Sequence, residues 1–308
     1  MRFVRVRLPR GGMRGGVVVG DEVVLLPERR YGAGRGFLAL VREAAQKSMS
    51  LASYLELKIR AEKRLRRLKY SELSGGGEGG PRLLIPILPP EVWGAGVTYL
   101  RSREAREYET KAKGIYDLVY EAERPEIFFK ATPSRCVGPD EVAYIRSDTN
   151  WAVPEPELAL VLGPRHEILG YTIGNDLSAR DIEGENPLYL PQAKIYKGCC
   201  ALGPAIALRE SVDDPKNLMI EMRILRSGSV VFSGSVSTSS LKRSLEELVE
   251  FLTRDNIIPP GTVLLTGTGI IPPNDFTLSD GDIVEIEVEK IGILRNRIGR
   301  LSSRGRRP

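Results

Sequence analysis

Residues 155–176, with the sequence EPELALVLGPRHEILGYTIGND, predict a β-hairpin with acidic residues at its open end. The apolar run 158–162 has the composition of a buried strand, and it stops at the turn-forming residues 164–167. A second strand is predicted over 168–173. The stretch therefore predicts two antiparallel strands whose register is set by the loop between them.

Three carboxylates are predicted to converge at the open end of this hairpin. A loop at 164–167 places Asp176 opposite Glu155, and Glu157 shares a face with Glu155 because side chains two apart on a strand point the same way. The hairpin puts no basic residue among them, so a cation is needed to keep all three ionised. Oxygen ligands favour Mg²⁺, with Mn²⁺ or Ca²⁺ as alternatives. The competing interpretation is a polar strand end with solvated acids.

Length and composition limit the class of protein. The 308 residues allow one large domain, or a domain with a smaller partner, and no apolar run approaches the roughly 20 residues of a membrane span. The N-terminus alternates basic and apolar residues, which is typical of a strand and not of a signal peptide. We therefore expect a cytoplasmic protein with no membrane partner.

The excess of positive charge is local. The net charge is +5, and cations concentrate in residues 58–69 and in the tail 304–308. Leu57, Ala61 and Leu68 belong to an apolar stripe at helical spacing, so we interpret the first cluster as the solvated face of a helix. We expect no nucleic-acid partner, and a small anionic substrate suits a basic protein equally well.

The order of predicted elements indicates an α+β fold. Short strands and two helices (36–48 and 51–72) are predicted before a glycine-rich linker, and mostly strands after it, interrupted by helices near 101–121 and 240–253. The predicted parts are a small N-terminal α+β domain (1–74), the linker (75–82) and a catalytic domain (83–308).

Few residues are available for acid–base chemistry. The single histidine, His166, lies in the predicted hairpin turn, so acid–base work falls to carboxylates, lysine or tyrosine. Glu126 is close to the aromatic pair Phe128 and Phe129, where burial would raise its pKa. Lys194 has apolar neighbours and is a candidate base. For either residue alone, a surface ion pair is the competing interpretation.

Several motifs, taken in order, resemble the fumarylacetoacetate hydrolase superfamily. They are WGAGVTY (93–99), FFK (128–130), EPELA (155–159), NDLSARD (175–181), Lys194, GP (203–204), TGT (266–268) and GD (281–282). The resemblance implies a mixed β-roll or sandwich of the C-terminal type found in that superfamily, with a divalent metal held by Glu155, Glu157 and Asp176. We also expect a homo-oligomer, either a dimer or a tetramer.

Within the superfamily, other segments resemble the archaeal dehydratases of 2-keto-3-deoxy-D-arabinonate. These segments are RPEIFFKATP (124–133), ENPLYLPQ (185–192), KIY (194–196) and GCC (198–200). The resemblance implies catalytic roles for Glu126 and Lys194. The hydrolases of the superfamily usually carry a histidine shortly after the Tyr99 position, and residues 100–104 contain none.

The activity implied is loss of water from a small 2-keto acid, giving 2,5-dioxopentanoate during pentose degradation. Tyr99, Lys130, Arg180 and Thr268 are candidates for contact with the substrate or for support of the site. The alternatives are a hydrolase of the acylpyruvate type or a decarboxylase acting at the same metal, a metal-binding scaffold without turnover, and a nucleic-acid-associated protein.

Overall fold

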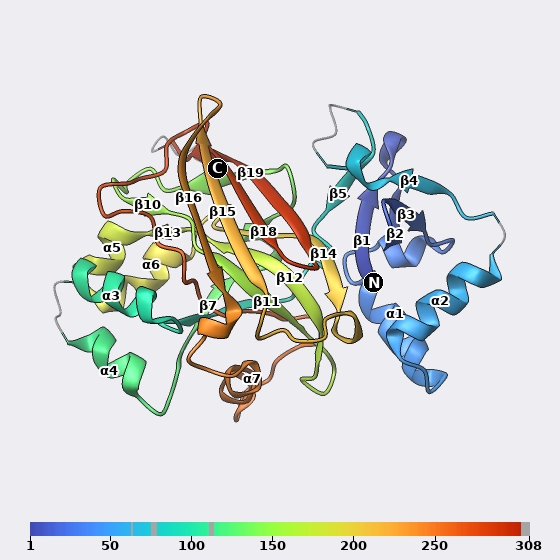
Figure 1. Cartoon of the computed structure of the whole chain (residues 1–308), viewed down its shortest axis with the longest axis horizontal. Coiled ribbons are helices and arrows are strands. Elements are labelled where there is room, and N and C mark those ends of the chain that lie inside the picture. Colours follow the sequence, from blue (N-terminus) through green and yellow to red (C-terminus); the bar gives the residue numbers. More distant parts are fainter. Residues whose placement is uncertain (63, 75–78, 111–113, 303–308) are drawn as a thin grey trace, which may run out of the picture.

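The computed structural model describes residues 1–62, 64–74, 79–110 and 114–302. They form a mixed α+β structure with a twelve-stranded sheet, a five-stranded sheet and a two-stranded pair (Figure 1). Strands outnumber helices, and most helices are short. The predicted α+β class is therefore confirmed.

The elements are as follows. The twelve-stranded sheet contains β1 (Arg2–Arg7), β2 (Met13–Val19), β3 (Glu22–Leu25), β4 (Arg67–Lys69), β5 (Arg82–Leu84), β6 (Val92–Gly96), β7 (Glu126–Ala131), β8 (Cys136–Val137), β11 (Pro156–Leu162), β12 (Ile168–Asp176), β14 (Cys200–Leu208) and β17 (Val263–Leu265). The five-stranded sheet contains β9 (Val142–Ile145), β15 (Met219–Arg226), β16 (Ser229–Ser237), β18 (Ile283–Val288) and β19 (Gly292–Arg300), and the pair is β10 (Ala152–Val153) with β13 (Ser178–Ala179). The helices are α1 (Gly36–Gln46), α2 (Leu51–Ala61), α3 (Leu100–Glu109), α4 (Ile115–Glu121), α5 (Arg180–Glu185), α6 (Leu190–Lys194) and α7 (Leu245–Thr253).

The hairpin β11–β12 lies inside the twelve-stranded sheet, whose order is β4-β3-β2-β1-β14-β12-β11-β17-β6-β7. Every residue of β11 is buried. The strand has β12 and β17 on its two sides, and β15 of the five-stranded sheet contacts its face. On β15, buried and exposed residues alternate, because only one face of that strand meets the larger sheet. Burial on all sides explains why every residue of β11 except Glu157 is apolar.

The predicted register of the hairpin is confirmed over most of its length. Pro156 pairs with Asn175, and the same offset holds as far as Val161 and Gly170. A bulge then shifts the pairing before the turn. At the open end, the Asp176 backbone N–H donates a hydrogen bond to the Glu155 carbonyl oxygen at 2.9 Å, so the two residues lie opposite each other as predicted.

The N-terminal strands continue the same sheet. β1 pairs with β14, and α1 and α2 lie on that side of the molecule (Figure 1). The division into domains at the glycine-rich linker stays a prediction, and residues 75–78 of that linker lie outside the described residues.

The predicted helix over 51–72 is wrong in its second half. α2 ends at Ala61. In the strand β4, Leu68 pairs with Val23 and is a partly buried residue that packs against the apolar cluster of β1, β2 and β3. Leu57 is 48% exposed, so the apolar stripe at helical spacing is not a core face. The pattern was misleading because Leu68 contacts the apolar cluster from a strand and not from a helix.

The other two predicted helices need smaller corrections. The helix expected near 101–121 is two helices, α3 and α4, and residues 111–113 lie outside the described part of the chain. The helix expected over 240–253 begins at Leu245, because the Ser244 hydroxyl accepts a hydrogen bond from the Glu247 N–H and caps it. Among the described residues, no helix is long and apolar enough to cross a membrane.

Candidate active site

The three predicted carboxylates come together. Glu155 lies immediately before β11, Glu157 lies within it, and Asp176 ends β12. Each offers a carboxylate oxygen, and these oxygens all lie within 4.8 Å of one another. All three side chains are buried, so their mutual repulsion is weakly screened by water. The alternative of a solvated strand end is therefore excluded.

The expectation that no basic residue lies among the carboxylates is wrong, because Lys194 enters from α6. Its Nζ lies 2.7 Å from Glu155 Oε2, 3.1 Å from Asp176 Oδ2 and 2.7 Å from the Ser178 hydroxyl oxygen. Three acceptors match the three N–H groups of an ammonium. Lys194 thus neutralises part of the acidic cluster in the state described.

A second lysine, Lys130 of β7, is fully buried beside the cluster. It forms an ion pair with Asp176 and donates hydrogen bonds to the carbonyl oxygens of Leu177 (2.9 Å) and Lys194 (2.6 Å). Burial favours loss of its proton, but Asp176 outweighs burial and raises the pKa of Lys130. Lys130 therefore ties the end of α6, which carries Lys194, to the end of β12.

Two arginines bind the other oxygen of Glu155. Arg180 Nη2 lies 3.0 Å and Arg106 Nη2 3.1 Å from Glu155 Oε1. Arg106 also forms an ion pair with Glu183. Burial acts to raise the pKa of Glu155, but Lys194 and the two arginines outweigh it and hold that pKa well below its ordinary value. Arg106 and Glu183 were not predicted as site residues.

Glu157 has a different environment from Glu155. Within the described ranges no cation lies at ion-pair distance from it, and the backbone N–H of Gly267 donates to one of its oxygens. Burial, and then the charges of Asp176 and Glu155, raise the pKa of Glu157 well above its ordinary value. The missing positive charge could be supplied by a proton or by a bound divalent cation. Three clustered carboxylates, one of them without a cation, are a donor set that suits Mg²⁺.

Glu126 lies next to this cluster. It belongs to β7 and pairs with Gly96 of β6, where a Cβ atom would overlap the Glu126 carboxylate. Burial raises the pKa of Glu126, and the charges of Arg106 and Lys194 partly oppose that rise. It also lines a cavity of about 260 Å³. The side chain combines access to a cavity with the raised pKa that a general acid needs.

The remaining predicted residues lie around the same site. Tyr99 precedes α3, and its buried hydroxyl has no hydrogen-bond partner among the residues that the structure describes. Burial and the Glu157 charge raise the pKa of Tyr99. Thr268 follows Gly267, and its hydroxyl accepts a 3.3 Å hydrogen bond from the Ile270 N–H.

His166 lies in the turn between β11 and β12, as predicted. Seven residues of β11 separate that turn from Glu155, which corresponds to about 20 Å along a strand. The histidine is therefore too far from the carboxylates for hydrogen bonding.

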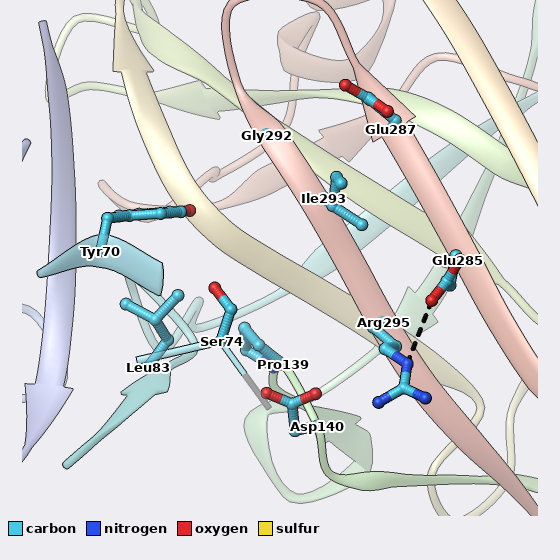
Figure 2. A pocket seen from close by; sticks show the side chains of 10 residues that line it. All are labelled: Tyr70, Ser74, Leu83, Pro139, Asp140, Glu285, Glu287, Gly292, Ile293 and Arg295. Atoms are coloured by element: carbon cyan, nitrogen blue, oxygen red, sulfur yellow. Dashed lines mark ion pairs between the residues drawn. The ribbon is translucent and has the colours of Figure 1, made fainter. Parts of the chain in front are cut away.

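A separate cavity of about 460 Å³ lies between the N-terminal part of the chain and the strands β18 and β19 (Figure 2). Tyr70 and Leu83 line one side, and Glu285 and Arg295, which form a 3.1 Å ion pair, line the other. None of its lining residues is a predicted site residue. The triad and this cavity are therefore distinct places in the molecule.

The fold and the buried acidic triad define a class of protein, and comparison with known families agrees. The Fumarylacetoacetate (FAA) hydrolase C-terminal family matches residues 91–299, and the chain belongs to that family. The match spans the strands and helices that carry every residue of the site described above.

Two relatives are dehydratases by name. The chain is 54% identical over 217 residues to the 2-dehydro-3-deoxy-D-arabinonate dehydratase of Saccharolobus solfataricus, covering 69% of this chain and 73% of that protein. It is 50% identical over 214 residues to a protein of Haloferax volcanii named a probable 2-keto-3-deoxyxylonate dehydratase, covering 70% and 74% of the two chains.

A solved structure gives the same result. It is a 2-keto-3-deoxy-D-arabinonate dehydratase complexed with magnesium and 2,5-dioxopentanoate, 41% identical to this chain with a TM-score of 0.81. The alignment covers 98% of this chain and all of the other. The resemblance inferred from the sequence motifs is thus confirmed at the level of both sequence and fold.

Proposed function

We propose that this protein is a metal-dependent dehydratase that converts 2-keto-3-deoxy-D-arabinonate to 2,5-dioxopentanoate. One observation carries the proposal: Glu126, with its raised pKa, and Lys194, a buried amine, lie beside the same buried carboxylate triad. An acid, an amine and a metal-binding donor set in one site are the groups that elimination of water beside a ketone requires. The named relatives support the choice of substrate.

Glu155, Glu157 and Asp176 would hold the metal, with Mg²⁺ the best match to three carboxylates. When bound, the cation supplies positive charge that acidifies the carbon beside the keto group of a 2-keto acid. Glu157 would give up its proton to the solvent as the cation binds, because the two positive charges compete for the same oxygens.

Lys194 is the proposed base. A base must be neutral, and in the state described the Lys194 amine donates to three acceptors. A metal held by Glu155 and Asp176 would compensate the carboxylate charge that binds the Lys194 ammonium. Lys194 can then release its proton and take one from the carbon next to the keto group.

Glu126 is the proposed acid. Hydroxide is a poor leaving group, so departure of the hydroxyl on the following carbon requires a proton donor. The raised pKa of Glu126 keeps its proton available for that step. Loss of water and tautomerisation then give the aldehyde product.

The reverse assignment, with Glu126 as base, makes a different prediction. If Lys194 is the base, Glu126→Gln should still exchange the proton beside the keto group with solvent deuterium, and Lys194→Met should not. Nuclear magnetic resonance of the recovered substrate reads this directly. Exchange in Lys194→Met and none in Glu126→Gln would reverse the two roles.

The other predicted residues have supporting roles in the proposal. Lys130 and Arg180 position Asp176 and Glu155 through the ion pairs described above. Tyr99 and Thr268 are proposed to contact the substrate. We further propose a cytoplasmic homo-oligomer, for which sedimentation analysis of the purified protein and fractionation of cells are the tests.

An acylpyruvate hydrolase is the second candidate, because it would use the same metal. Residues 100–104 contain no histidine to activate water, and His166 lies at the far end of the hairpin. An assay of the purified protein with a 2-keto acid panel separates the two. Aldehyde formed from the sugar acid much faster than pyruvate from an acylpyruvate supports the dehydratase, and the opposite ratio supports the hydrolase.

A further inference from the structure

Two of the three cysteines lie side by side on neighbouring strands. Cys136 begins the short strand β8, Cys200 begins β14, and the two residues are direct partners in the parallel pairing of these strands. Neighbouring strands lie about 4.8 Å apart, which falls within the roughly 4.4–6.8 Å that separates the Cα atoms of a disulfide. Both residues are free thiols in the structure. The backbone therefore already has the spacing that a disulfide between them needs.

The two thiols also contact each other. The side-chain hydrogen bond with Cys136, followed by burial, raises the pKa of the Cys200 thiol well above its ordinary value. The Cys136 thiol in turn donates to the carbonyl oxygen of Thr132 at 3.4 Å. The Cys199 thiol is directed elsewhere, since it donates to the Lys130 carbonyl oxygen at 3.9 Å and adjacent residues of an extended chain point to opposite faces. Cys136 and Cys200 are therefore the two thiols placed to react with each other.

Only one thiol of this pair is open to a reagent from solution. Cys136 is partly exposed and follows the exposed residues Pro133 and Ser134, whereas Cys200 is fully buried. A small oxidant such as H₂O₂ therefore reaches Cys136 first. The oxidised sulfur of Cys136 would then have the Cys200 thiol as its neighbour, which is the arrangement of an oxidisable cysteine with its resolving cysteine.

We propose that Cys136 and Cys200 form a peroxide-sensitive thiol pair whose disulfide weakens metal binding at the carboxylate triad. In the first step, the Cys136 sulfur attacks H₂O₂. An S–O bond forms, the O–O bond breaks, and one water leaves with the thiol proton, which gives a sulfenic acid. In the second step, the Cys200 sulfur attacks the sulfenic sulfur, an S–S bond forms, the S–O bond breaks and a second water leaves. The two thiols together lose two electrons, which reduce the peroxide to water.

The link to the metal site runs through β14. Cys200 pairs with Cys136 on one side and with Asp176, at the end of β12, on the other. A disulfide brings the two Cβ atoms to about 3.8 Å, closer than the spacing of neighbouring strands, so the start of β14 has to move toward β8. The backbone N–H of Leu177 donates to the Cys199 carbonyl oxygen at 3.1 Å, so the end of β12 is tied to this movement. Asp176 would then shift relative to the other two carboxylates of the triad.

The first test counts free thiols in denaturant after fully reduced protein has been treated with H₂O₂. Wild type should fall from three thiols to one and recover all three with dithiothreitol. Cys199→Ala, the matched control, should still form the disulfide. Cys200→Ala should instead stop at the sulfenic acid of Cys136, which dimedone labels and mass spectrometry locates.

Three results would overturn the thiol pair. They are wild type that keeps its three thiols, a disulfide that still forms in Cys200→Ala, and a disulfide-linked dimer of wild type on a non-reducing gel. The disulfide-linked peptides of wild type can be identified without any substitution, so a folding defect in a variant does not hide the outcome.

The second test measures Mg²⁺ binding by calorimetry before and after oxidation. Oxidised wild type should bind Mg²⁺ about tenfold more weakly or worse, as when a group that supports a metal ligand is lost, and dithiothreitol should restore the affinity. Cys136→Ala treated with the same peroxide is the control and should bind as before treatment. Equal affinity in oxidised and reduced wild type would overturn the link to the metal.

The link to the metal rests on the proposed function, whereas the thiol pair does not. Neither measurement uses a substrate. Reduced wild type that binds no Mg²⁺ would therefore reject the metal site of the proposed function, and the thiol count would still decide whether Cys136 and Cys200 form the disulfide.

Discussion

The two ends of the β11–β12 hairpin carry similar side chains and have opposite properties. The turn holds Arg165, His166 and Glu167. Arg165 forms a 3.9 Å ion pair with Glu167, and its side chain is 88% exposed. The open end holds three buried carboxylates that meet cations from α3, α5, α6 and β7. The difference shows that the carboxylates at the open end have unusual pKa values because distant segments of the chain bury them and place cations beside them. An exposed ion pair, in contrast, contributes little to stability.

Among changes at the two ends of the hairpin, removal of the metal from the open end should have the largest effect on turnover. Exhaustive chelation should abolish turnover, because the three carboxylates at the open end then have no divalent cation to hold. Added Mg²⁺ or Mn²⁺ should restore it. Activity is measured by aldehyde formation before and after dialysis against a chelator. Full activity in thoroughly demetallated protein would contradict the role of the triad.

The next largest effect should come from the two catalytic candidates. Lys194→Met and Glu126→Gln should each lower kcat by about 100-fold or more, as expected for loss of a general acid or base. Steady-state kinetics measures the loss, and calorimetry should show that both variants still bind Mg²⁺. A variant that loses metal binding together with turnover would indicate a role in the metal site instead.

The comparison also explains what could be predicted from the sequence. The register of the hairpin depends on a short loop and a period of two, so Glu155, Glu157 and Asp176 could be placed together from local rules. Arg106 and Glu183 could not be found in this way. They lie on polar helical segments, where a buried charged residue has the same sequence signature as an exposed one.

Stability should separate Glu155 from Glu157 in metal-free protein. Glu155→Gln removes the charge that three buried cations share, so we expect a loss of roughly 3 kcal/mol in the free energy of unfolding. Glu157→Gln should leave stability nearly unchanged at or below about pH 4.5 and should raise it at higher pH, because the folded wild type takes up a proton at Glu157 and the amide needs none. Chemical denaturation measures both. Equal losses would show that the two carboxylates share one environment.

The raised pKa of Glu157 also predicts how the stability of the metal-free protein changes with pH. The folded-state pKa of Glu157 is raised, so the folded protein keeps a proton that the unfolded chain releases above its ordinary pKa. Metal-free stability should therefore fall as pH rises above about 4.5, by up to about 1.4 kcal/mol per pH unit for one proton. Glu157→Gln should flatten this slope. An unchanged slope would mean that the proton resides elsewhere.

The smallest effect is expected at the turn. His166→Ala should change kcat by less than about twofold and stability by less than about 1 kcal/mol, because the residue lies far from the carboxylates on the surface side of the hairpin. The same kinetic and denaturation measurements apply. A large loss of turnover here, with Lys194→Met active, would move the catalytic assignment to the other end of the hairpin.

The most direct test of the account is the product formed in deuterated water. With Mg²⁺ and 2-keto-3-deoxy-D-arabinonate, nuclear magnetic resonance should show 2,5-dioxopentanoate with deuterium at the carbon beside the keto group, because that carbon loses a proton and regains one from solvent. No carbon dioxide and no pyruvate should appear. Cleavage of a carbon–carbon bond, or a product without deuterium at that carbon, would contradict dehydration through proton loss at this site.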